Sequence, residues 1–124
     1  MPVLYRPACI AHHDHRVTPE SYLTREKMMG VAALQLAAAA PDCARDIFGR
    51  DITSSEELDY SREFVRREQP LADRLAKSFA AMATIPGTSI DGPQAPMILR
   101  TLYEHHLLLK RWAWRQGLCE ALDR

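Results

Sequence analysis

The chain has 124 residues, of which 47% are apolar and 26% charged, a composition typical of one folded domain and not of a disordered chain. Sixteen basic residues balance sixteen acidic ones, so no overall field draws the protein to nucleic acid or to an anionic membrane surface. The same neutrality weakens repulsion between copies of the chain, which makes self-association easier.

The cysteines and the length of the apolar runs indicate where in the cell the protein is located. Cys9, Cys43 and Cys119 are odd in number and widely spaced, unlike a disulfide framework. The sequence has neither the roughly 18 consecutive apolar residues of a spanning helix nor the pattern of a signal peptide. We therefore expect a cytoplasmic protein that does not cross a membrane, and the richness in alanine and arginine suggests a bacterial or phage source.

The first predicted helix begins near residue 18. Residues 1–17 show no sustained period and are expected to form an irregular N-terminal arm, followed by one helical domain over residues 18–124. Thr18, Pro19 and Glu20 supply an N-cap, a first-turn proline and an acidic residue, which predicts a helix from here to about Ala39. Its alanine-rich second half would allow another helix to approach closely.

Two further helical regions are expected before residue 84. Pro41 interrupts the first helix, and residues 42–48 predict a short helix closed by Gly49. Ser54 and Glu57 fit a reciprocal capping box at the start of the next helix. Because proline lacks an N–H group, Pro70 either kinks that helix or begins a new one, and we expect a break near Gln69.

A long loop and a strongly apolar helix complete the chain. Residues 84–96 contain three prolines and two glycines and are expected to form the longest connection. Pro96 then begins a helix that continues past Gly117. One of its faces repeats apolar residues at helical spacing, and this face comprises Leu99, Leu102, His106, Leu109 and Ala113. Leu108 and Trp112 widen the apolar surface, so we expect this helix to be central.

These patterns predict an all-α fold, an irregular bundle of four to five helices with an N-terminal arm and a long loop before the last helix. No segment alternates apolar and polar residues for long enough to predict a sheet. Gly-rich phosphate loops, His-Glu-x-x-His and a Gly-flanked nucleophile are absent from the sequence. We therefore expect no enzymatic activity and no cofactor.

The histidines define a candidate metal site. Imidazoles and a carboxylate are ligands that zinc, nickel and copper prefer, and His12, His13 and His15 surround Asp14. Adjacent residues do not form a closed site alone, so Cys9 and His12 would need His105 or His106 of the last helix, with the arm folded onto that helix. The alternative, which we rank higher, is that these histidines are solvated and that His106 is a hydrogen-bonded core residue.

The last helix also carries a candidate partner-binding surface made of Lys110, Arg111, Trp114 and Arg115. An outward indole between guanidinium groups is typical of a protein-binding hot spot, and the same residue types stack on bases and contact phosphates. Trp112 and Trp114 point to different sides, so one could fill the core while the other faces outward. With zero net charge, we rank a protein partner above nucleic acid.

Three functional hypotheses follow. The first is a small non-enzymatic protein-interaction module, an adaptor, inhibitor or regulator, for which homodimer formation is one option. The second is a metal-dependent enzyme or metal sensor built on the histidines. The third is a nucleic-acid-binding regulator that uses the basic and tryptophan-containing surface.

Overall fold

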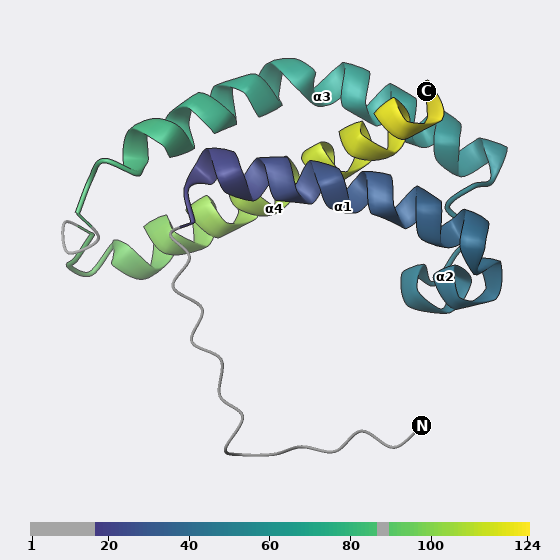
Figure 1. The fold of residues 1–124 in the computed structure, drawn as a ribbon. Helices are drawn as coiled ribbons and strands as arrows, with labels where there is room; N and C mark the ends of the chain where they lie inside the picture. Colours follow the sequence, from purple (N-terminus) through teal and green to yellow (C-terminus); the bar gives the residue numbers. More distant parts are fainter. Residues whose placement is uncertain (1–16, 87–89) are drawn as a thin grey trace, which may run out of the picture.

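The computed structural model describes residues 17–86 and 90–124. These residues form four helices and no strand, which confirms the predicted all-α fold. The helices are α1 (Pro19–Ala39), α2 (Pro41–Phe48), α3 (Ser55–Met82) and α4 (Ala95–Leu122) (Figure 1). The residues proposed as an arm lie outside the described part of the chain, apart from Val17.

The helix ends follow local chemistry. Thr18 and Ser21 exchange hydrogen bonds at the start of α1, since the Thr18 hydroxyl accepts from the Ser21 N–H and the Ser21 hydroxyl accepts from the Thr18 N–H. Gly49 adopts a φ of 67° after α2, a left-handed conformation that favours glycine. The Ser54 hydroxyl accepts from the Glu57 N–H, so Ser54 is the N-cap of α3. The reciprocal bond from Glu57 is not formed, because its carboxylate faces two arginines instead.

The predicted break near Gln69 is wrong. Helix α3 runs through Pro70 without interruption and bows along its length (Figure 1). A proline inside a helix removes one backbone hydrogen bond and bends the helix, but it ends the helix only when packing on both sides does not hold it. Here Phe64 packs before the proline, and Ala72 and Leu75 pack after it, so both halves are held in the core.

Helix α4 is central, as predicted. It forms the main interfaces with both α1 and α3, whereas α1 and α3 touch each other much less. One core cluster joins α1, α2 and the C-terminal part of α4 around Ile52 and Leu118. A second cluster joins α3 to the middle of α4 through Ala72, Leu75 and Leu109, with Leu23 of α1 against it.

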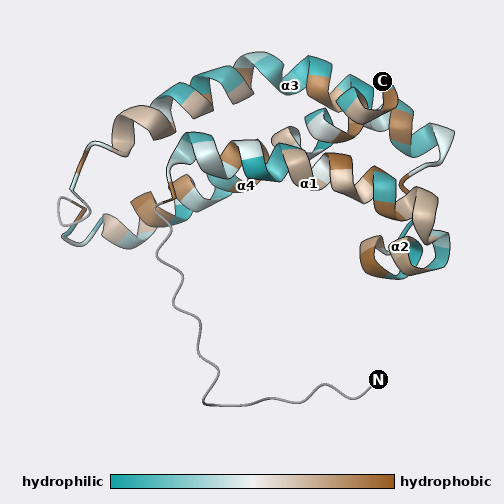
Figure 2. Cartoon of the chain, in the orientation of Figure 1, coloured by the Kyte–Doolittle hydropathy of each residue, from teal (hydrophilic) through white to brown (hydrophobic). Residues whose placement is uncertain are grey.

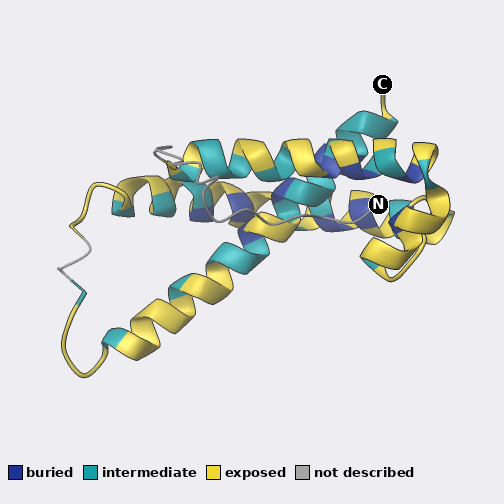
Figure 3. Ribbon diagram, turned by 60° about the horizontal axis from the view of Figure 1, so that its bottom comes forward, coloured by how far each residue is buried: buried dark blue, intermediate teal, exposed yellow. Residues whose placement is uncertain are grey.

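The N-terminal half of α4 extends away from these two clusters. Figure 3 shows this half as a largely exposed segment that projects from the packed part of the molecule. Three of its apolar side chains, Ile98, Leu99 and Tyr103, are 42%, 52% and 60% exposed. In the hydropathy view, apolar residues are present along this projecting half (Figure 2). The packed core therefore stops partway along α4.

Candidate functional site

The four residues of the predicted partner-binding surface line one hollow of about 430 Å³. Helix α4 contributes Lys110, Arg111, Trp114 and Arg115 to it. We call this hollow the basic-aromatic pocket. Its other lining residues are Glu26 of α1, Arg50 of the loop before α3, Tyr60 and Phe64 of α3, and Leu108 of α4. Four cations thus line the pocket against one lining carboxylate.

Arg115 holds α4 against α3. Its Nη1 donates to the Ser61 hydroxyl at 2.7 Å and to Oε1 of Glu57 at 3.1 Å. Ser61 is completely buried, so this hydrogen bond satisfies a hydroxyl that water cannot reach. The guanidinium also lies 4.6 Å from the centre of the Tyr60 ring, a cation–π geometry. Arg115 is therefore a structural cation that forms the inner wall of the pocket.

Two guanidinium groups converge on Glu57. Arg50 donates from Nε to the same Oε1 atom at 2.8 Å. Burial raises the pKa of Glu57, but the hydrogen bonds from Arg50 and Arg115 outweigh that effect, so the pKa lies below its ordinary value of 4.5. With one carboxylate shared by two arginines, positive charge remains at this end of the pocket.

Neither tryptophan faces solvent fully, contrary to the expectation that one indole points outward. Trp114 is half-buried and its ring lies 5.9 Å from that of Phe48, against the Ile52 and Leu118 cluster. Trp112 is half-buried on another side of α4, where its Nε1 donates to the Val65 carbonyl at 3.0 Å. The Trp114 ring is thus covered from the side of α2, and the Trp112 ring from the side of α3.

The exposed aromatic residue of the pocket is Tyr60, which sequence reasoning missed. Its side chain is 51% exposed and stacks on Phe64 one helical turn away, with ring centroids 6.0 Å apart. The available signal was the spacing of four residues between two aromatic rings in an arginine-rich helix. Lys110 and Arg111 are the exposed cations contributed by α4.

The metal hypothesis rests largely on residues outside the described part of the chain, where His12, His13 and His15 lie. Within residues 17–86 and 90–124, no group of three or more histidine, cysteine, aspartate or glutamate side chains is placed to hold a metal ion. His106 is half-buried, and its Nε2 lies 2.8 Å from the Tyr22 hydroxyl, which fits the hydrogen-bonded alternative. Burial raises the pKa of Tyr22 above 10.0, so the phenol keeps its proton at neutral pH.

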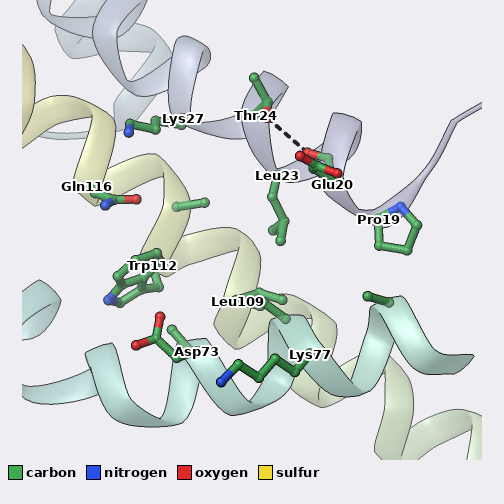
Figure 4. Close-up of a pocket in the computed structure, with 14 residues that line it drawn as sticks. Pro19, Glu20, Leu23, Thr24, Lys27, Asp73, Lys77, Leu109, Trp112 and Gln116 are labelled. Atoms are coloured by element: carbon green, nitrogen blue, oxygen red, sulfur yellow. Dashed lines mark hydrogen bonds between the residues drawn. The ribbon is translucent and has the colours of Figure 1, made fainter. Parts of the chain in front are cut away.

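A second hollow of about 430 Å³, which we call the apolar groove, lies on the opposite side of α4 (Figure 4). Leu109, Trp112 and Ala113 form its floor, while Leu23 of α1 and Ala76 of α3 belong to its walls. The α4 residues of this groove and those of the basic-aromatic pocket project from nearly opposite faces at 100° per residue. The rim carries charges of both signs, two acidic and two basic: Glu20, Asp73, Lys27 and Lys77.

Comparison with known proteins gives no assignment: no family model matches the chain, and neither a curated protein nor a solved structure is significantly similar to it. Among the described residues, no helix has a stretch long and apolar enough to cross a membrane.

Proposed function

We propose that this chain is a non-enzymatic protein-interaction module that binds a partner protein at the basic-aromatic pocket. The proposal rests on how the apolar side chains are divided between the surface and the core. Among the described residues, eleven large hydrophobic side chains are exposed, whereas five of the ten buried apolar residues are alanines. Contiguous exposed apolar surface typically marks a site that another macromolecule covers, and one of these eleven side chains, Tyr60, lies in the basic-aromatic pocket.

The pocket has the composition of a binding hot spot. Tyrosine and arginine are enriched at the centres of protein interfaces, because they supply contact area and hydrogen bonds at modest desolvation cost. Tyr60 presents an exposed ring, and the Arg115 guanidinium lies 4.6 Å from the centre of that ring. Because Arg115 is already paired with Glu57 and Ser61, it needs no reorganisation when a partner binds.

The charge of the pocket indicates the kind of partner. Lys110 and Arg111 are exposed at its edge, and Glu57 is shared between Arg50 and Arg115. A partner segment that carries carboxylates beside an apolar or aromatic residue would match both the charge and Tyr60. Two exposed cations are few for binding along a phosphate backbone, so we continue to rank a protein partner above nucleic acid.

The test is an affinity capture from a lysate of the source organism, with bound proteins quantified by mass spectrometry. Arg111→Glu reverses a charge at the pocket, whereas Arg74→Glu makes the same change on an exposed residue of α3 that lines neither hollow. We expect one or more proteins to be retained by the wild-type chain and by Arg74→Glu, and to fall at least tenfold with Arg111→Glu. Identical captures with all three chains would overturn the assignment of the pocket.

A further inference from the structure

Among residues 17–86 and 90–124, the apolar face of α4 continues past the packed core to side chains that stay exposed at Ile98 and Leu99. Leu109, Ala113 and Gly117 are buried on this face in the C-terminal half of the helix. At 100° per residue, Ile98, Leu99 and Leu102 extend the same face into the projecting half, where Leu99 is 52% exposed. We call the continuous face from residue 98 to residue 116 the α4 stripe.

The two halves of the α4 stripe differ in shape. The half from 98 to 103 is a projecting ridge, because no other described helix covers it (Figure 3). The half from 109 to 116 is the floor of the apolar groove between α1 and α3 (Figure 4). His106 lies between them, beside a smaller hollow of about 250 Å³ that Tyr22 and Phe79 also line. One helix therefore carries an apolar ridge and an apolar groove in sequence on a single face.

We propose that the α4 stripe binds a second copy of this chain, with the two α4 helices antiparallel. This inference rests on the proposed function and names one partner of the interaction module. In an antiparallel pair, the ridge of each copy lies in the groove of the other, and a two-fold axis passes near His106. Such a contact is isologous: each copy supplies the same ridge and the same groove, so the assembly closes as a dimer.

The charge of the chain fits a second copy. The chain has no net charge, and the acidic and basic residues on the groove rim balance, so no field repels an identical molecule. The stripe is roughly 27 Å long at 1.5 Å per residue and about 10 Å wide, the diameter of a helix with its side chains, which gives a footprint of about 270 Å² on each copy. A stable interface typically buries about 800 Å² on each partner, so the α1 and α3 walls of the apolar groove must supply the rest of the contact.

The test is the oligomeric state of the full-length chain, measured by sedimentation equilibrium from about 1 to 200 µM under reducing conditions. Leu99→Glu places a charge on the ridge, and Met97→Glu is the matched control. Met97 is 65% exposed and lies about 160° around α4 from Leu99, away from the stripe. We expect the wild-type chain and Met97→Glu to dimerise, and the dimer dissociation constant to rise at least tenfold with Leu99→Glu.

The groove half of the proposed contact is tested with Ala76→Arg, because Ala76 belongs to the α3 wall of the apolar groove. We expect the homodimer of this variant to be at least tenfold weaker than that of the wild type, as for Leu99→Glu, and an equimolar mixture of the two variants to form heterodimers. The mixed pair keeps one wild-type ridge-and-groove contact, and in the other contact the introduced carboxylate faces the introduced guanidinium. Circular dichroism spectra and unfolding curves identify any variant that has lost its fold, and Leu99→Gln then replaces an unfolded Leu99→Glu.

The outcomes separate this inference from the proposed function. A wild-type chain that stays monomeric at every concentration would overturn the dimer, even if Arg111→Glu still abolishes capture of a partner. Equal weakening by Leu99→Glu and Met97→Glu would also overturn it, because the interface would then not be the α4 stripe. A dimer that only Leu99→Glu weakens supports the inference, whether or not Arg111 affects partner capture.

Discussion

Gly30 of α1 and Gly117 of α4 allow the two helices to cross with their backbones in contact. A β-carbon added at Gly30 would overlap the Trp114 carbonyl group, and one added at Gly117 would overlap the Lys27 carbonyl group. Each glycine thus faces the backbone of the other helix. Ala33 and Ala37 continue the small-residue surface of α1, so the bulk of the contact comes from backbone and methyl groups.

The first prediction concerns this crossing. We expect Gly30→Ala and Gly117→Ala each to destabilise the fold by about 1–3 kcal/mol, the range for overpacked sites, in urea unfolding. Helix propensity alone predicts the opposite sign, because alanine is favoured over glycine inside a helix by about 1 kcal/mol. A more stable variant would therefore show that the helices do not cross this closely.

The second prediction concerns pH. Because the folded-state pKa of Glu57 lies below 4.5, its ion pairs with Arg50 and Arg115 stabilise the fold above the unfolded pKa. This contribution is lost as the pH falls through the folded pKa. We expect Glu57→Gln to be less stable than wild type at pH 7, with the difference shrinking steadily below pH 4.5. Urea unfolding at pH 7, 5, 4 and 3 checks this, and a difference that is independent of pH would contradict it.

The third prediction concerns Arg115. We expect Arg115→Met to destabilise the fold by about 2–3 kcal/mol, because it leaves Ser61 and Glu57 without their shared donor in a largely buried place. Arg66→Met is the control, since Arg66 forms an exposed pair with Glu63 within one turn of α3. Such surface pairs contribute roughly 0–1 kcal/mol. Similar losses in thermal or urea unfolding for both variants would contradict the structural role of Arg115.

The fourth prediction separates the two tryptophans. We expect Trp112→Phe to lose about 1 kcal/mol more stability than Trp114→Phe, because only the Trp112 indole donates a hydrogen bond among the described residues. That bond reaches the Val65 carbonyl, in the turn of α3 before Pro70. Denaturant unfolding of both variants measures the difference. Equal losses in the free energy of unfolding would show that the hydrogen bond to Val65 adds no stability beyond the packing of the ring.

The helices and most of their ends could be predicted because those signals are local. Thr18 with Pro19, Ser54 and Gly49 act on backbone groups within one turn, so their effect does not depend on what packs nearby. The apolar spacing along α4 likewise predicts a central helix, because apolar residues at every third or fourth position favour packing against neighbouring helices. The sequence also grouped Lys110, Arg111, Trp114 and Arg115, which do line one pocket.

The sequence by itself therefore determined the helical class of the fold, most helix starts and ends, and the apolar face of α4. The tertiary structure decided which residues of different helices contact one another. Packing on both sides of Pro70 keeps α3 continuous, although proline favours a break. Ser61 and Glu57, more than fifty residues away in the chain, turn Arg115 inward. Because such contacts join residues far apart in sequence, no local pattern contains them, and only the packed helices show which apolar residues are covered.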